Sequence, residues 1–136
     1  MEEIEIVEAG PNDVGGRTRG LGVDSRSSDI ILAGGASGGM WKTTDRGTNW
    51  VQTSELGDNL GVTSLIQDPL NLDTWYYSTG EFLGASSRAR GGGGQLYGSG
   101  IYTSTDNGDT WSQIPSTSDD DVSFNSEFDF ISRVEI

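Results

Sequence analysis

The sequence predicts an all-β fold, namely part of a β-propeller built from four-stranded antiparallel blades. Two observations carry this prediction: an eight-residue pattern occurs twice, and the segments before each copy repeat as well. The composition agrees, because 21 of the 136 residues are glycine and only 32% are apolar. That balance is typical of short strands joined by tight turns, and no window shows the apolar spacing of an amphipathic helix.

The repeated pattern spans residues 43–50 and 104–111. Each copy has a hydroxyl residue, an Asp, a Gly and a Trp at positions one, three, five and eight, which are Thr43, Asp45, Gly47 and Trp50, then Ser104, Asp106, Gly108 and Trp111. We expect a hairpin turn between the third and fourth strands of a blade, in which Gly adopts a positive φ and Asp accepts turn N–H groups. A structural role is favoured over the alternative, in which the two aspartates bind calcium or sugar.

A shift of 44 residues aligns the segments that precede the pattern. The first blade is expected to have strands at residues 18–23, 30–33, 39–43 and 49–52, and the second at 62–67, 75–78, 100–103 and 110–113. Asp45 and Asp106 are 61 residues apart, so the second copy carries 17 additional residues. The expected organisation begins with a lead-in at 1–15 that could close a ring, followed by blade one at 16–57. Blade two is expected at 58–118, with an inserted loop at 79–100. An acidic loop at 119–136 is expected to end in the first strand of a third blade at 131–136.

The charge pattern and the missing residue types disfavour several functions. The net charge is −13 with a single lysine, Lys42, which argues against binding to nucleic acid or to an anionic membrane surface. Cysteine and histidine are absent, so thiol catalysis, a Ser-His-Asp triad and a Cys/His zinc site cannot be built from this chain. No apolar run is long enough to insert into a membrane.

Candidate binding residues fall on the loops opposite the repeated turns. The inserted loop contains Glu81, Arg88, Arg90 and Tyr97, a set that suits a carboxylate or the face of a sugar. The alternative is a solvated loop, favoured by the glycine run at 91–94. Asp119, Asp120 and Asp121 offer oxygen ligands to calcium, whereas an acidic solvated loop is the competing interpretation. No catalytic residue and no other cofactor is predicted.

The repeated pattern resembles the Asp-box, or BNR repeat, of sialidases, sortilin-type receptors and xyloglucan-cleaving glycosidases. Residues 10–17 and 38–45 resemble the opening blades of large secreted bacterial proteins of this superfamily. The resemblance implies an extracellular or cell-surface protein. The first copy departs from the family pattern at Asn49, where Thr is usual, and the Arg-Ile-Pro segment and Tyr/Glu pair of sialidases are not found.

These observations favour a non-catalytic binding or scaffold segment that recognises glycan or protein through its loop face. Two alternatives stay open: part of a xyloglucanase-like or sialidase-like glycoside hydrolase whose catalytic residues lie partly outside this segment, and an assembly or stability factor within a larger complex. A propeller ring needs at least four blades. The expected partners are therefore the remaining blades of the same propeller or a protein that completes it.

Overall fold

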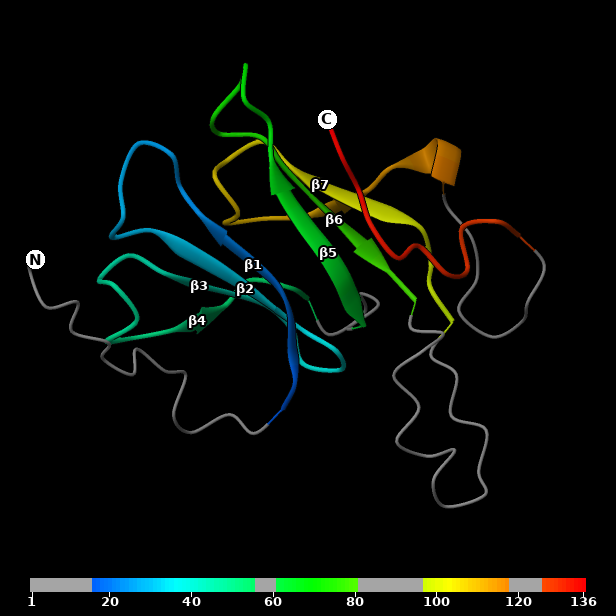
Figure 1. Ribbon diagram of the computed structural model, residues 1–136, viewed down its shortest axis with the longest axis horizontal. Coiled ribbons are helices and arrows are strands. Elements are labelled where there is room, and N and C mark those ends of the chain that lie inside the picture. The colour runs from blue at the N-terminus through cyan, green and yellow to red at the C-terminus, as the bar shows by residue number, and fades with distance from the viewer. Residues whose placement is uncertain (1–15, 56–60, 81–96, 118–125) are drawn as a thin grey trace, which may run out of the picture.

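The computed structural model describes residues 16–55, 61–80, 97–117 and 126–136, and it contains two four-stranded antiparallel sheets (Figure 1). The strands of each sheet follow chain order. The first sheet contains β1 (Thr18–Val23), β2 (Ile31–Gly35), β3 (Gly39–Thr43) and β4 (Val51–Gln52), and the second contains β5 (Val62–Gln67), β6 (Trp75–Thr79), β7 (Ile101–Ser104) and β8 (Ser112–Gln113). A short 3-10 helix, Pro115–Thr117, follows β8. The predicted fold class of four-stranded blades is confirmed.

The strand predictions hold with small shifts. The predicted bounds of β1, β3 and β5 agree with the structure, whereas β4 and β8 are only two residues long. They start late because Asn49 and Thr110 are still part of the turn, where their backbone N–H groups donate to a turn aspartate.

The expected strand at residues 131–136 is not formed. This segment has no strand ladder in the structure, and its contacts with the second sheet are isolated hydrogen bonds. The backbone N–H of Ile131 donates to the carbonyl of Thr79, and the N–H of Val134 donates to the hydroxyl of Ser64. On β5, the acceptor for Val134 is thus a side-chain hydroxyl and not a backbone carbonyl. The segment therefore lies beside the sheet without joining it.

The two sheets pack face to face around a shared apolar core. Leu32 and Met40 from the first sheet and Val62, Trp75 and Tyr77 from the second are all buried. The sheets can approach closely because β1 and β2 carry glycine where they meet the second sheet. A Cβ at Gly22 would lie 2.4 Å from the Trp75 ring, and one at Gly34 would lie 2.3 Å from Val62.

Each sheet has two distinct ends. At the end that we name the turn end, the β1–β2 and β3–β4 turns are joined by the N–H of Arg46, which donates to the carbonyl of Asp29 at 3.1 Å. The second sheet repeats this bond between Asn107 and Asp73 at 2.8 Å. The opposite end, which we name the loop end, carries the β2–β3 connection, the end of β6 and the start of β7 (Figure 1). Within the described ranges, no helix is long and apolar enough to span a bilayer.

Candidate functional site

In the first repeated turn, the aspartate accepts hydrogen bonds from other residues of the same turn. The Thr43 hydroxyl donates to Asp45 at 2.8 Å and accepts the N–H of Gly47 at 2.9 Å. Asp45 also accepts the N–H of Asn49 at 2.8 Å and its side-chain amide at 2.6 Å. The backbone N–H of Asn49, followed by its side chain and Thr43, lowers the pKa of the Asp45 carboxyl.

The second turn repeats this network with different side chains. The Ser104 hydroxyl donates to Asp106 at 2.7 Å and accepts the N–H of Gly108 at 2.8 Å. Thr110 donates its N–H and its hydroxyl to Asp106 at 2.9 and 2.5 Å. Burial acts to raise the pKa of Asp106, but the hydrogen bonds from Thr110, Ser104 and Asp109 outweigh it and lower the pKa to about 2.

Both turns place two consecutive residues in the left-handed region. Arg46 and Gly47 have φ values of 61° and 87°, and Asn107 and Gly108 have values of 59° and 84°. Positive φ at two consecutive residues is what the central positions of a type I′ turn require. The sequence predicted the positive φ of the glycines but not that of the residues before them.

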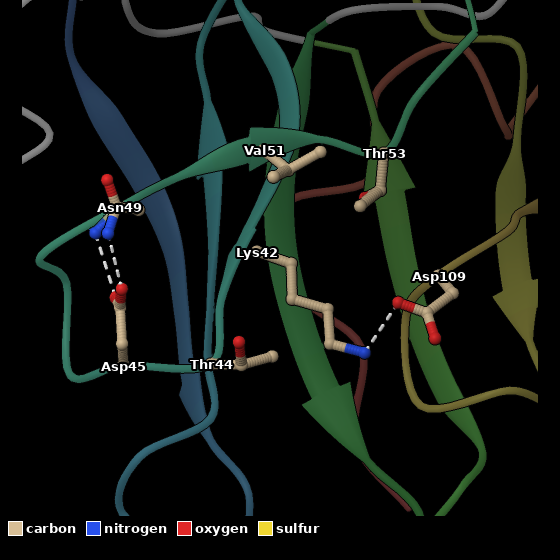
Figure 2. A pocket seen from close by; sticks show the side chains of 7 residues that line it. All are labelled: Lys42, Thr44, Asp45, Asn49, Val51, Thr53 and Asp109. Atoms are coloured by element: carbon tan, nitrogen blue, oxygen red, sulfur yellow. Dashed lines mark hydrogen bonds and ion pairs between the residues drawn. The ribbon is translucent and has the colours of Figure 1, made fainter.

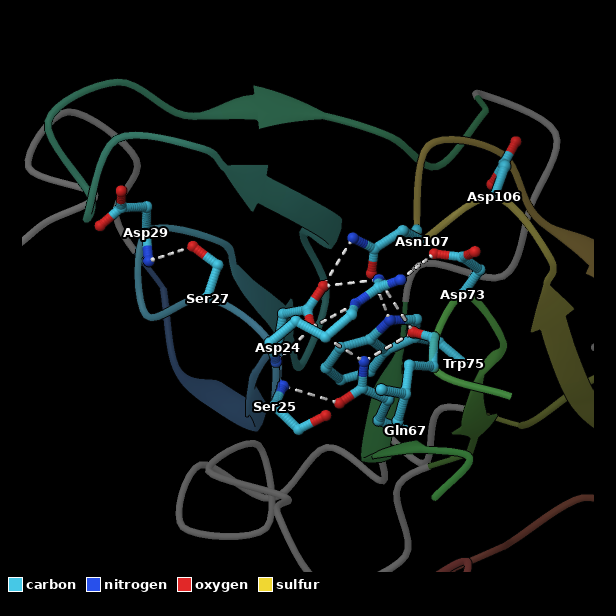
Figure 3. A network of polar contacts seen from close by, with 12 residues as sticks. Asp24, Ser25, Ser27, Asp29, Gln67, Asp73, Trp75, Asp106 and Asn107 are labelled. Atoms are coloured by element: carbon cyan, nitrogen blue, oxygen red, sulfur yellow. Dashed lines mark hydrogen bonds and ion pairs between the residues drawn. The ribbon is translucent and has the colours of Figure 1, made fainter. Parts of the chain in front are cut away.

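A polar network at the turn end joins the two blades (Figure 3). Its centre is Asp24, which follows β1 and is 3% exposed. The guanidinium of Arg26 holds this carboxylate in two hydrogen bonds, of 3.1 and 2.8 Å, and its remaining nitrogen pairs with Asp73 of the second blade at 2.6 Å. Asn107 donates to Asp24 at 2.7 Å and accepts the indole N–H of Trp75 at 2.7 Å.

The buried carboxylate of Asp24 accepts hydrogen bonds from the side chains that surround it. Hydrogen bonds from Arg26 are the largest influence and hold the pKa of Asp24 well below its usual range, despite burial that acts in the opposite direction. The same contact with Asp24, helped by Asp73, raises the pKa of Arg26. Since a buried carboxylate without partners is costly, the second blade stabilises the first through these contacts.

A second polar contact between the blades lies in a hollow of about 200 Å³ (Figure 2). Lys42 on β3 is 9% exposed, and its ammonium pairs with Asp109 of the second repeated turn at 2.7 Å. The remaining residues that line the hollow are Thr44, Asp45, Asn49, Val51 and Thr53. Trp111 closes the same interface by donating its indole N–H to the Thr53 hydroxyl at 3.1 Å.

Of the predicted ligand-binding residues, the structure describes Tyr97 alone. Tyr97 lies at the loop end, half-buried, and its ring is tilted against Phe130 with the centroids 5.7 Å apart. Glu81, Arg88 and Arg90 lie outside the described residues, as do the calcium candidates Asp119, Asp120 and Asp121. In the part of the chain that is described, no group of three acidic residues is close enough to hold a metal ion.

Sequence reasoning missed the interblade network. A shift of 44 residues places Asp24 and Asp68 at equivalent positions, each directly after the first strand of its blade. Nothing in that alignment showed that Asp24 meets Asn107, because the two are 83 residues apart in sequence. Phe130 was missed for the same reason, because its partner Tyr97 is distant from it in the sequence.

Comparison with known proteins gives the architecture its context. No protein-family profile matches the chain. A xyloglucanase from Hypocrea jecorina is 33% identical over an alignment of 124 residues, which covers 77% of this chain and 14% of that enzyme. Two crystal structures superpose on the described fold: an ancestral GH74 enzyme, with a TM-score of 0.55 at 21% identity over 76% of this chain, and the GH74 enzyme of Niastella koreensis, with a TM-score of 0.50 at 25% identity over 74%.

The two sheets are blades of a β-propeller. Their fold is of the glycoside hydrolase type represented by these GH74 structures. The chain spans 14% of the length of the xyloglucanase, and 11% and 14% of the two structures. The propeller is therefore represented here by two adjacent blades and the polar interface between them.

Proposed function

We propose that these two blades belong to a secreted propeller protein that binds a plant-type polysaccharide of the xyloglucan class through its loop end. The observation that carries the proposal is the 33% identity with a xyloglucanase, joined to a GH74-type fold. In this proposal the described blades supply scaffold and binding surface, and they contribute no catalytic acid.

An aromatic pair at the loop end supports a role in binding. Tyr97 and Phe130 are half-buried, and their rings lie in contact. Aromatic faces with a polar tip provide apolar contact for a sugar ring together with a hydrogen-bonding group. Arg88 and Arg90 precede Tyr97 on the same inserted loop, so we propose that they contribute to the same surface.

Four described carboxylates have the hydrogen bonding of structural groups and not of a catalytic acid. A glycoside hydrolase needs one carboxylic acid that stays protonated near neutral pH, which requires a raised pKa. The carboxyl groups with shifted pKa values in the described ranges are Asp24, Asp45, Asp68 and Asp106, and each shift is downward. These four side chains are therefore suited to structural hydrogen bonding.

We propose further that the two repeated turns are Asp-boxes with a structural role. The support is the internal use of their carboxylates, since Asp45 and Asp106 both accept hydrogen bonds from their own turns. A turn occupied in this way has few acceptor positions left for calcium or a sugar hydroxyl.

Calorimetric titration of the protein with xyloglucan oligosaccharides tests the binding proposal. Tyr97→Ala should weaken binding roughly tenfold, equivalent to about 1.4 kcal/mol. Val51→Ala is the matched control, because Val51 is an exposed apolar residue on the outer strand β4. Equal affinity of Tyr97→Ala and the unmodified protein would contradict the assignment of this surface.

The second candidate function is participation in a glycoside hydrolase, favoured by the activity named for the relative from Hypocrea jecorina. The two candidates differ in turnover. Release of reducing ends from xyloglucan, measured alongside the titration, would favour the hydrolase, whereas saturable binding without release would favour the binding segment.

A further inference from the structure

The sequence contains one Asn-Gly pair, Asn107-Gly108, and it lies in the second repeated turn. Asparagine is a chemically labile residue. It loses its side-chain amide most readily when glycine follows, because glycine has no side chain to hinder the approach of its backbone nitrogen. The equivalent pair in the first turn is Arg46-Gly47, and arginine has no amide to lose. Of the two repeated turns, only the second can react in this way.

The reaction at such a pair has two steps and consumes one water molecule. The backbone nitrogen of Gly108, after losing its proton to solvent, attacks Cγ of Asn107. A C–N bond forms, the bond between Cγ and Nδ2 breaks, and Nδ2 leaves as ammonia with a proton taken from solvent. Water then opens the five-membered ring at either of its two carbonyls, which gives aspartate or isoaspartate. No group is oxidised or reduced.

In the folded protein both reacting groups are held by other partners (Figure 3). Gly108 is buried, and its N–H donates to the Ser104 hydroxyl at 2.8 Å. The Asn107 amide donates from Nδ2 to Asp24 at 2.7 Å, and its Oδ1 accepts the indole N–H of Trp75 at 2.7 Å. Ring closure needs a free nitrogen and a side chain that can turn towards it. The native contacts therefore oppose the reaction.

We propose that Asn107 is a deamidation site, that the contact between the blades protects it, and that its reaction permanently weakens that contact. Asp24 belongs to blade one, whereas Asn107 belongs to blade two. Separation of the blades thus removes the acceptor that restrains Nδ2, even while each sheet stays folded. Local openings of this kind are far more frequent than global unfolding. The site lies at the turn end, and the proposal is independent of glycan binding.

Both products are incompatible with the native interface. Aspartate at position 107 places a carboxylate against Asp24, where the amide now donates at 2.7 Å. Two carboxylates this close cannot both ionise without cost. The cation of this network, Arg26, is already paired with Asp24 and Asp73. Isoaspartate instead adds a methylene to the backbone of a residue whose φ is 59°, which disrupts the turn itself.

The test is the rate of deamidation at Asn107 in the full chain, incubated in mildly alkaline buffer and followed by peptide mass spectrometry with isoaspartate detection. The native chain should react at least about tenfold more slowly than the same chain in concentrated urea. Asp24→Ala should restore most of the denatured rate, because the acceptor of Nδ2 is lost. Asp68→Ala is the matched control: it removes the equivalent carboxylate of blade two, whose hydrogen-bond partners come from its own turn, and should leave the rate unchanged.

A milder pair of variants keeps the test decisive if Asp24→Ala does not fold. Trp75→Phe removes the indole N–H that holds Asn107 and should accelerate the reaction about fivefold. Trp41→Phe is its control, since the indole N–H of Trp41 donates to Gly38 within blade one. Equal rates in the native and denatured chain would overturn the proposal. So would equal rates in Trp75→Phe and Trp41→Phe, because protection would then not act on the Asn107 side chain.

The effect of the product is tested with Asn107→Asp. This variant should raise the equilibrium constant for unfolding about tenfold, measured by chemical denaturation. Combination with Asp24→Asn should cost less than the sum of the two single substitutions, because one of the two facing carboxylates is removed. An Asn107→Asp protein as stable as the unmodified chain would contradict the proposed loss of the interface. None of these results bears on xyloglucan binding at Tyr97.

Discussion

Asp24 and Asp68 begin equivalent turns in the two blades, yet they lie in different surroundings. Asp24 is 3% exposed and is bound by Arg26, Gln67 and Asn107, of which the last two belong to the other blade. Asp68 is half-buried and is bound by residues of its own turn, Leu70 and Asn71. The local turn is thus retained in both blades, and the additional partners come from the adjacent blade.

This comparison separates two sources of stability in a repeat protein. Intrinsic blade stability comes from turns such as 104–111, whose hydrogen bonds close within a few residues. Interface stability comes from contacts such as Asn107 with Asp24 that exist only when a neighbour is present. In repeat arrays the two contributions are approximately additive, so substitutions at equivalent positions should reveal each one separately.

The largest effect is expected at Gly22, one of the positions where the two blades approach closely. In Gly22→Ala the new Cβ would lie 2.4 Å from the ring of Trp75, which is 1% exposed and cannot move aside freely. Overpacking of this kind should lower the free energy of unfolding by about 3 kcal/mol. Chemical denaturation followed by Trp fluorescence measures the change.

Two controls define this effect as an interface clash. Gly16→Ala adds the same methyl group where no atom lies within 4 Å, and it should leave stability nearly unchanged. At the equivalent position of blade two, Ile66→Val should cost only about 0.5–1 kcal/mol. A Gly22→Ala protein as stable as Gly16→Ala would contradict the observed packing.

The next largest effect is expected from removing the charge of Asp24. Asp24→Asn keeps the shape of the side chain but weakens its charge-assisted hydrogen bonds with Arg26, and it should cost about 2–3 kcal/mol. Asp68→Asn should cost less than about 1 kcal/mol, because its partners are backbone and amide groups at a more exposed turn. Equal losses in the two variants would show that the interface adds nothing to the local turn.

The same aspartates predict how stability depends on pH. The folded-state pKa of Asp24 is depressed, and that of Asp106 is lowered to about 2 from an unfolded value near 4. A depressed carboxyl pKa adds stability above the unfolded pKa, and this stability is lost as the pH falls through the folded pKa. We expect the unfolding free energy to decrease from about pH 4 downward, and less steeply in Asp24→Asn. An identical acid dependence in that variant would rule out Asp24 as a contributor.

Much of the fold follows from sequence because it depends on local chemistry. The hydroxyl, Asp and Gly of each repeated turn bind one another within five residues, so their spacing reveals the hairpin directly. The interface could not be predicted in this way. Asn107 appears in the sequence as an ordinary turn residue, and only the packing of the blades brings it to Asp24. The segment 131–136 contains the β-branched residues Ile131, Val134 and Ile136, which favour a strand, but a strand also requires a partner ladder.

A smaller effect is expected at the Lys42–Asp109 pair. Lys42 is 9% exposed but Asp109 is 64% exposed, so solvent screens the attraction between them. A double-mutant cycle with Lys42→Met and Asp109→Asn should give a coupling energy of about 1 kcal/mol or less. The coupling should shrink in 0.5 M salt, to about half or below, because one partner is accessible to ions. A coupling energy that does not change with salt would indicate a more enclosed pair.

The smallest effect, and a stabilising one, is expected at Arg46. Its φ of 61° costs energy for an Arg side chain, whereas Asn, which stands at the equivalent Asn107, tolerates this conformation better. Arg46→Asn also removes the ion pair with Asp29, but both partners are well exposed and the pair contributes little. The net result should be a gain of about 0.5 kcal/mol in unfolding free energy. Arg46→Ala is the control, since it loses the ion pair without relieving the backbone, and it should be less stable than Arg46→Asn. The reverse order would mean that the exposed ion pair, and not the left-handed backbone, governs stability at this turn.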